Sequence, residues 1–201
     1  NFLIKNFLRE IFLDCVILNF MNQGISLKFI CDEQLGRLAR WLRILGQDVV
    51  YQNQVSDSQI IEQAKKESRM VLTRDHNLAE KLFQEGIKYY LVEENYPAHQ
   101  LREVVERFQS QLQLRVFSRC VECNLPLEEI EKAKVKNLVP PFVFQTQEVF
   151  RRCPGCGKIF WSATHRQQVD LQLRDILGDL YDRLLEEVWN PSPPIKEKST
   201  G

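Results

Sequence analysis

With 201 residues, the chain has room for one α/β domain and a smaller module. Its 44% content of hydrophobic residues excludes a wholly disordered protein. Lysine plus arginine equals aspartate plus glutamate at 27 each, which excludes an overall basic signature for nucleic acid, although the local field at one site can still attract a polyanion.

Residues 1–25 are rich in Phe, Leu and Ile, but Lys5, Arg9, Glu10 and Asp14 interrupt the apolar run. The segment therefore lacks the stretch of about 18 uncharged apolar residues that a membrane span needs. No small-residue cleavage site of a signal peptide follows it. We expect an amphipathic helix here and no membrane association. The missing initiator Met suggests that the chain is the end of a longer protein.

Short apolar runs alternate with helical patterns across residues 26–117. We expect strands at 27–31, 48–51, 70–73 and 88–92. We expect helices at 34–45, 56–67, 78–85 and 98–108. Gly46 and Gly86 each stand where one of these helices ends. This alternation predicts an α/β fold, an open parallel sheet with helices on both faces.

The pattern changes at about Phe117, and three further segments follow. Residues 118–167 contain paired cysteines, prolines and short apolar pieces, which indicate a small zinc ribbon. Residues 168–190 form one amphipathic helical pattern, whose apolar stripe consists of Val169, Leu173, Ile176, Leu180, Leu184 and Val188. Residues 191–201 are polar and contain prolines, and they predict a disordered tail.

Four cysteines form two Cys-x2-Cys pairs: Cys120, Cys123, Cys153 and Cys156. Two tight cysteine turns can supply the four thiolates that a tetrahedral zinc ion needs. Four thiolates leave the ion no open position, so this zinc is predicted to be structural. Cys15 and Cys31 lie in apolar runs and are expected in the core. Six cysteines without a signal peptide favour a reducing compartment, and we expect a cytoplasmic protein.

Acidic residues follow two of the predicted strands. Asp32, with Glu33 beside it, and Asp75 come directly after strands, and Asp57 begins a helix expected at the same edge of the sheet. In an open parallel sheet, ligands bind beyond the carboxyl ends of the strands. Carboxylates gathered there can hold Mg²⁺ or Mn²⁺, which supports hydrolysis of phosphodiesters. The alternative is that Asp57 begins its helix and Asp75 ends its strand for structural reasons alone.

Basic residues near this edge are candidate ligands of RNA phosphates. Three of them fall three residues apart on the helix after Asp32, and these are Arg37, Arg40 and Arg43. A solvated helix face is the alternative for this row. A second patch beside the last cysteines consists of Arg151, Arg152 and Lys158. Arg74 and His165 complete the candidates, although a surface or packing role is the alternative for His165.

Taken together, these segments resemble the C-terminal ribonuclease domain named after the Mut-seven exonuclease, a PIN-fold family with a fused zinc ribbon. The segments are FICDEQLGRLARWLRILGQDV, SDSQIIEQAKKESRMVLTRD, SRCVECNLPLE, VPPFVF, FRRCPGCGKIFW and the final His165. The resemblance runs from about Phe29 to His165 and rests on the order and spacing of all six segments. One departure is the stretch from Trp161 to His165, which lacks the acidic residue and the Gly that the family tends to show there.

The resemblance implies a PIN-like parallel sheet and hydrolysis of RNA with Mg²⁺ or Mn²⁺. Asp32, Asp57 and Asp75 match acidic positions of the family, and Glu33 matches less closely. It also implies that a larger exonuclease domain lies upstream, and that this domain or other RNA-processing proteins are partners. Our hypothesis is a metal-dependent ribonuclease with a zinc ribbon that aids RNA binding. The alternatives are an inactive zinc-ribbon module that binds RNA, or an accessory or structural part of a larger 3'-5' exoribonuclease.

Overall fold

The computed structural model of the chain describes residues 27–161 and 164–185. The predicted amphipathic helix at 1–25 and the predicted disordered tail at 191–201 lie outside the described residues. Within the described ranges, no helix is both long enough and apolar enough to cross a membrane.

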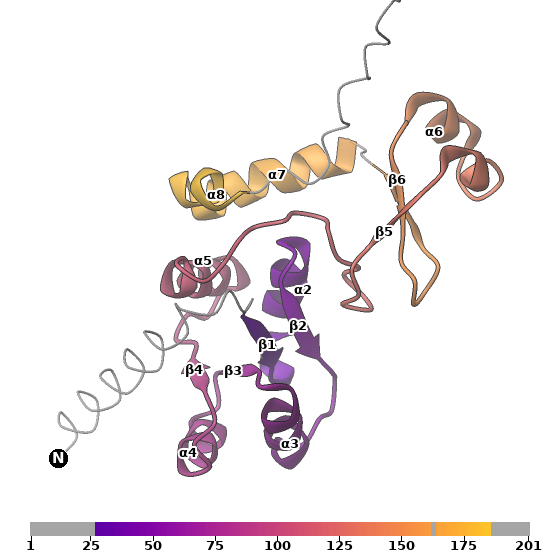
Figure 1. Cartoon of the computed structure of the whole chain (residues 1–201). Coiled ribbons are helices and arrows are strands. Elements are labelled where there is room, and N and C mark those ends of the chain that lie inside the picture. Colours follow the sequence, from indigo (N-terminus) through magenta and orange to yellow (C-terminus); the bar gives the residue numbers. More distant parts are fainter. Residues whose placement is uncertain (1–26, 162–163, 186–201) are drawn as a thin grey trace, which may run out of the picture.

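A four-stranded parallel sheet forms the centre of the larger domain (Figure 1). Its strands are β1 (Lys28–Cys31), β2 (Asp48–Tyr51), β3 (Met70–Thr73) and β4 (Tyr89–Leu91). They lie in the order β2-β1-β3-β4, and Ile30 in β1 is paired with Val50 in β2 and Val71 in β3. The predicted strand positions and the open parallel sheet are confirmed. Because all strands run the same way, their carboxyl ends meet at one edge.

Helices cover both faces of the sheet. They are η1 (Glu33–Leu35), α2 (Gly36–Ile44), α3 (Asp57–Glu67), α4 (His76–Gln84) and α5 (Pro97–Phe108). Successive strand residues point to opposite faces. In β1, Phe29 packs in one core with residues of α2 and α5, whereas Ile30 packs in the other core with residues of α3 and α4. The expectation of helices on both faces is therefore confirmed.

The C-terminal segment differs from the single helix predicted for residues 168–190. Two helices occupy its described part, α7 (Thr164–Leu177) and α8 (Asp179–Leu184). Gly178 separates them with a φ of +57°, a backbone conformation that glycine adopts without strain. Leu173 and Tyr181 are fully buried in the same core as α2 and α5. The chain thus returns from the ribbon to complete the larger domain.

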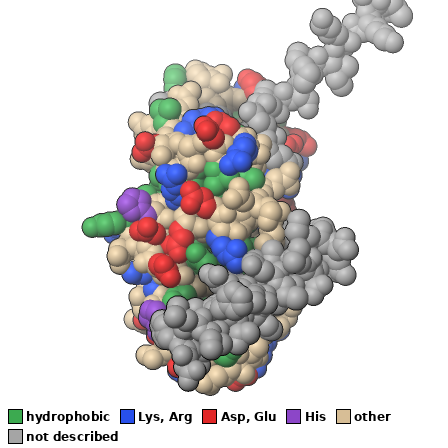
Figure 2. Space-filling view, turned by 90° about the vertical axis from the view of Figure 1, so that its left-hand side faces the viewer, with side chains coloured by type: hydrophobic (Ala, Val, Ile, Leu, Met, Phe, Trp, Pro, Cys, Tyr) green, Lys and Arg blue, Asp and Glu red, His purple; other side chains and the backbone are tan. Residues whose placement is uncertain are grey.

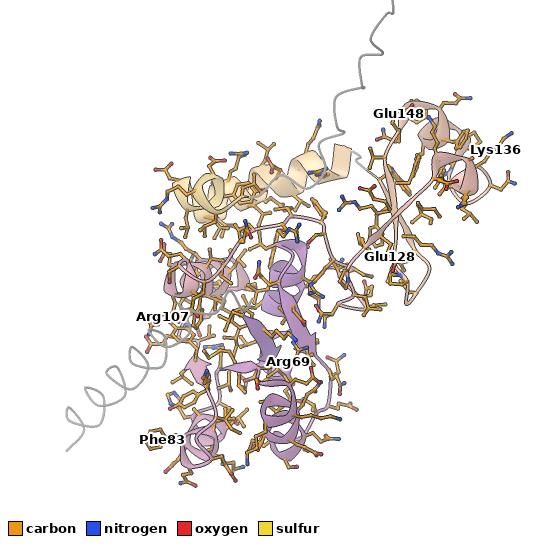
Figure 3. All side chains as sticks on the ribbon, viewed as in Figure 1. Arg69, Phe83, Arg107, Glu128, Lys136 and Glu148 are labelled. Atoms are coloured by element: carbon orange, nitrogen blue, oxygen red, sulfur yellow. The ribbon has the colours of Figure 1, made fainter. Side chains whose placement is uncertain are left out.

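The ribbon is a three-stranded antiparallel sheet with strand order β5-β6-β7. It consists of β5 (Glu128–Ile130), β6 (Phe150–Arg152) and β7 (Ile159–Trp161), with η2 (Lys132–Val135) and α6 (Pro141–Thr146) between the first two strands. Val135, Val139 and Phe150 form its small core. Figure 3 marks Glu128 in β5, and Lys136 and Glu148 toward the outer end of the ribbon. On the face shown in Figure 2, basic and acidic side chains are interspersed, consistent with zero net charge.

Candidate active site and metal centre

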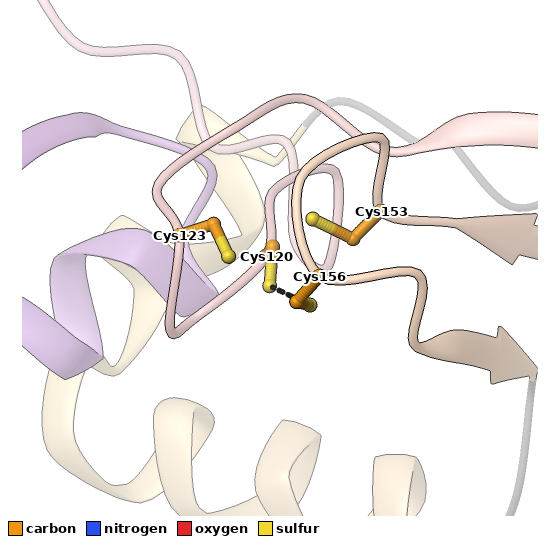
Figure 4. A group of neighbouring side chains, drawn as sticks. All are labelled: Cys120, Cys123, Cys153 and Cys156. Carbon is orange, nitrogen blue, oxygen red and sulfur yellow. Dashed lines mark hydrogen bonds between the residues drawn. The ribbon is translucent and has the colours of Figure 1, made fainter.

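The four predicted zinc ligands converge. The Sγ atoms of Cys120, Cys123, Cys153 and Cys156 all lie within 4.8 Å of one another (Figure 4). Cys120 and Cys156, which belong to different pairs, have their Sγ atoms 3.8 Å apart. All four are free thiols, and so is Cys31, which is buried in the core as expected, whereas Cys15 lies outside the described residues. This donor set is compatible with a structural zinc ion.

Each cysteine pair sits in a tight turn. The backbone N–H of Asn124 donates to the carbonyl oxygen of Cys120, and that of Gly157 donates to the carbonyl oxygen of Cys153, both at 2.9 Å. Asn124 and Gly157 have positive φ angles, which Asn and Gly tolerate best. A hydrogen bond from the backbone N–H of Lys158 lowers the pKa of Cys156 to about 7. This bond favours the thiolate, the form that binds zinc.

Arg43 joins the first cysteine turn to the larger domain. Its Nη1 donates to the carbonyl oxygens of Val121 at 2.9 Å and Glu122 at 3.2 Å, and its Nε donates to the carbonyl oxygen of Val49 at 2.9 Å. The side chain is buried, and these three bonds satisfy most of its donors. The guanidinium of Arg43 is therefore occupied by contacts within the protein, and these contacts disfavour its predicted role in RNA binding.

A second connection runs through Asn124, directly after Cys123. Its Oδ1 accepts from the backbone N–H of Val49 at 3.0 Å, and its Nδ2 donates to Oδ1 of Asp48 at 2.7 Å. Arg69 also donates to Oδ1 of Asp48, at 2.7 Å. Burial raises the pKa of Asp48, but the hydrogen bonds from Arg69 and Asn124 outweigh burial, and the net pKa is lowered. The first cysteine turn is thus hydrogen-bonded to the edge strand β2.

Asp32 lies buried at the carboxyl end of β1. Its Oδ1 accepts from the backbone N–H of Gln34 at 2.9 Å. Its Oδ2 accepts from the hydroxyl of Thr73 at 2.5 Å and from the backbone N–H of Arg74 at 3.0 Å. Gln34 lies in η1, and Thr73 and Arg74 lie at the end of the neighbouring strand β3. The parallel pairing of β1 with β3 therefore fixes where this carboxylate points.

Asp75 is bonded to the same group of residues. Its backbone N–H donates to Oγ1 of Thr73 at 2.9 Å, so one buried hydroxyl connects Asp32 with Asp75. Its own Oδ1 caps helix α4 and accepts from the backbone N–H groups of Asn77 at 2.7 Å and Leu78 at 3.4 Å. The capping role weighed from the sequence is real, and it leaves Oδ2 without a hydrogen-bond partner among the residues described.

Asp57, the first residue of α3, is linked to this edge through a lysine. Lys81 of α4 donates from Nζ to Oδ2 of Asp57 at 2.7 Å. The pKa of Lys81 is raised, first by this hydrogen bond and also by the negative charge of Asp75. Lys81 therefore interacts with two of the three predicted aspartates. Glu33 is exposed, and only its backbone oxygen, which accepts from the hydroxyl of Tyr51 at 3.3 Å, is bonded to a neighbouring strand.

The three aspartates are connected but do not converge as the cysteines do. Within residues 27–161 and 164–185, the four cysteines are the group of three or more potential metal ligands whose atoms lie close enough to share an ion. The sequence reasoning missed Thr73 and Lys81, which link the aspartates. Thr73 had a usable signal, since it is the last strand residue before Arg74 and Asp75. Lys81 had none, because its contact depends on how α3 and α4 pack.

The remaining basic candidates differ in their accessibility. Arg37, Arg40, Arg152 and Lys158 are exposed. Arg40 makes an ion pair with Glu122 at 3.6 Å, in which both side chains are more than half exposed. Arg151 is buried and pairs with Glu129 at 3.5 Å, which disfavours its predicted role in RNA binding. The side chain of His165 lies outside the described residues.

Arg74 is half-buried, and its Nη2 donates to Oδ1 of Asn95 at 2.6 Å. Its guanidinium therefore contacts the loop after β4, and its backbone N–H contacts Asp32. Arg74 therefore links Asp32 with the loop after β4 at the carboxyl edge of the sheet.

A comparison with protein families matches residues 27–173 to the Mut7-C RNase domain. The chain belongs to this family. The match spans the sheet, the ribbon and the first part of α7, so a Mut7-C domain includes both the acidic edge and the cysteine cluster. Membership indicates a ribonuclease-type function with RNA as the substrate. Searches of curated proteins and of solved structures each find no match to the chain.

For this Mut7-C domain we expect one zinc ion per chain with four sulfur ligands. Cys153→Ser should release the zinc and unfold the ribbon, because apparent zinc-binding free energies of about 10–16 kcal/mol are largely folding free energy in small modules. Elemental analysis gives the stoichiometry, and X-ray absorption spectroscopy gives the ligands. Cys31→Ala, which removes a buried thiol outside the cluster, is the control and should keep its zinc. Nitrogen or water in the coordination shell would contradict the assignment.

Proposed function

We propose that the protein is a metal-dependent ribonuclease that hydrolyses RNA phosphodiesters at the edge formed by Asp32, Asp57 and Asp75. The observation that carries the proposal is the connection of Asp32 and Asp75 through the buried hydroxyl of Thr73. Together with family membership, this connection argues for a built site, because one buried hydroxyl is bonded both to the carboxylate of Asp32 and to the backbone of Asp75.

The chemistry of this edge fits Mg²⁺ or Mn²⁺. Both ions prefer carboxylate oxygens, and the edge offers carboxylates from three different elements. Oδ2 of Asp75 has no hydrogen-bond partner among the described residues, and Asp32 accepts three hydrogen bonds where a carboxylate has about four acceptor positions. Asp32 and Asp75 would hold the ion, with Asp57 as a further ligand. A bound ion would supply an activated water and stabilise the leaving oxygen.

The surrounding residues orient the carboxylates. Thr73 donates to Asp32 and accepts from the backbone of Asp75, so it fixes both in one arrangement. Lys81 carries a positive charge next to Asp57 and Asp75. It reduces their repulsion in the metal-free protein, and its hydrogen bond to Oδ2 leaves Oδ1 of Asp57 for an ion.

The zinc ribbon has a structural role and presents cations to the RNA. Its first turn is bonded to α2 and β2 through Arg43 and Asn124, so the ribbon is held against the domain that carries Asp32. Arg152 and Lys158 are exposed on the ribbon. They can contact phosphates, together with Arg37 and Arg40 of α2. An upstream exonuclease partner and a cytoplasmic location belong to the same proposal.

One observation favours an alternative function. Because Lys81 already pairs with Asp57, the acidic edge is partly neutralised without any metal. A module that binds RNA and does not cleave it could keep this arrangement. The two functions differ in their response to the loss of a single carboxylate.

We expect Asp75→Asn to abolish cleavage and leave the fold intact. Asn caps a helix about as well as Asp, so α4 should keep its first turn, whereas the lost charge weakens cation binding. Purified wild-type protein should cleave single-stranded RNA with Mg²⁺ or Mn²⁺, and the variant should not, with circular dichroism and thermal unfolding as the checks on folding. Cleavage that survives Asp75→Asn, or a wild type that binds RNA and never cleaves it with either metal, would favour the alternative.

We also expect the double variant Arg37→Gln and Arg40→Gln to bind RNA more weakly than the wild type. Each lost phosphate contact on a single strand should reduce the slope of log affinity against log salt by about 0.7. A charge-matched control replaces Lys66 of α3 and Arg183 of α8, two other exposed cations, with Gln. RNA affinity is measured by titration at several salt concentrations. If both double variants give the same slope, Arg37 and Arg40 do not contact the RNA, and they belong to a solvated helix face.

A further inference from the structure

The loop between β4 and α5 begins at the carboxyl edge of the sheet. It comprises Glu93, Glu94, Asn95 and Tyr96, between the end of β4 and the first residue of α5. The backbone N–H of Val92, just before it, donates to the carbonyl oxygen of Thr73 at 2.8 Å. The loop therefore starts next to the residue that connects Asp32 with Asp75.

This loop is held in place by side chains of α5. The carboxylate of Glu103 accepts from the backbone N–H groups of both Glu93 and Glu94, each at 3.0 Å. Gln100, only 4% exposed, donates to the carbonyl oxygens of Glu94 at 3.0 Å and Asn95 at 3.4 Å. Because the backbone amides and carbonyls of the loop are hydrogen-bonded in this way, its last residue, Tyr96, is held in one position.

Arg74 ties the loop to the acidic edge. Its backbone N–H donates to Oδ2 of Asp32 at 3.0 Å, and its side chain donates to Oδ1 of Asn95 at 2.6 Å. Tyr96 is the next residue after Asn95. Arg74 thus connects the buried Asp32 directly with the loop that carries Tyr96.

The ring of Tyr96 projects into solvent from this fixed position. Tyr96 is 68% exposed, and no side-chain hydrogen bond caps the helix that it precedes. Its ring meets the ring of His99 edge-on, with the centroids 5.7 Å apart. Single exposed aromatic residues are ordinary on protein surfaces. Tyr96 differs because a network of hydrogen bonds holds it beside the candidate active site.

The charges around Tyr96 limit what it can bind. Glu93 and Glu94 are exposed beside it, and Glu94 pairs with His99 at 3.5 Å. A hollow that these residues share with Arg102, Glu103 and Arg107 lies over β4 and α5. On the face shown in Figure 2, acidic side chains lie close to basic ones. Within the loop itself, Glu93 and Glu94 disfavour a phosphate next to the ring, whereas an uncharged planar group can pack on its exposed face.

We propose that Tyr96 stacks on an unpaired base of the RNA strand whose phosphodiester lies at Asp32 and Asp75. The inference rests on the proposed ribonuclease function and deepens it by naming a residue that positions the single-stranded substrate. Proteins recognise single strands through aromatic rings that stack on splayed bases, and this contact tolerates any base because every base has a flat face. Tyr96 would act as a positioning residue that sets where the strand enters the site.

The test uses the 201-residue chain with Asp75→Asn as a background that binds without cleaving. Fluorescence anisotropy measures the affinity for a labelled single-stranded oligoribonucleotide. Adding Tyr96→Ala should weaken binding by about 5- to 100-fold, the range expected for loss of one base–aromatic stack. Tyr96→Phe should keep wild-type affinity, because the ring and not the hydroxyl makes the contact.

Phe83→Ala is the matched control. Phe83 is 60% exposed, and it lies near the C-terminal end of α4, away from the end that Asp75 caps (Figure 3). Its loss should leave affinity unchanged. An oligoribonucleotide scanned with single abasic sites adds a second readout. In the Asp75→Asn protein, an abasic site at one position of the oligoribonucleotide should weaken binding. In the protein that also carries Tyr96→Ala, the same abasic site should cause no further loss of affinity.

The outcomes separate the two proposals. If wild-type protein cleaves RNA but Tyr96→Ala binds as tightly as Phe83→Ala, the stacking inference is overturned and the ribonuclease function stands. Equal losses from both Ala variants, or an abasic effect independent of Tyr96, also overturn it. If the wild type neither binds nor cleaves RNA, the proposed function and the inference fail together.

Discussion

The buried carboxylate of Asp32 is the constraint around which the candidate active site is arranged. A buried charge is unfavourable unless it is hydrogen-bonded, and three donors satisfy this one, from Gln34 in η1 and from Thr73 and Arg74 at the end of β3. The hydroxyl of Thr73 is one of these donors, and it also accepts from Asp75, which caps α4. The backbone N–H of Arg74 is another, and its side chain braces the next loop. Strand pairing therefore places the acidic residues and the loop that carries Tyr96.

A second set of buried polar contacts explains why the ribbon is part of the domain. Arg43 and Asn124 connect the first cysteine turn to α2 and β2, and Asp48 is shared between Asn124 and Arg69. The chain then returns through α7 and α8, whose buried residues share a core with those of α2 and α5. Loss of the zinc would therefore disturb the edge strand of the sheet as well as the ribbon.

The sequence predicts the features that depend on local pattern. Short apolar runs indicate the strands, and the spacing of Cys120, Cys123, Cys153 and Cys156 is enough to place the metal centre. It does not predict which arginines are buried, because Arg43 has the same helical spacing as the exposed Arg37 and Arg40. Burial of Arg43 depends on a turn far along the chain that packs against it. Lys81 reaches Asp57 for the same kind of reason. Gly178 was a local signal for the break between α7 and α8.

The most direct test of the acidic edge as a metal site is anomalous diffraction from crystals of the zinc-loaded protein soaked in Mn²⁺. The account predicts a manganese peak bonded to oxygens of Asp32 and Asp75, separate from the zinc peak at the four cysteines. A crystal with manganese elsewhere on the surface, and with an empty edge at Asp32 and Asp75, would contradict the account.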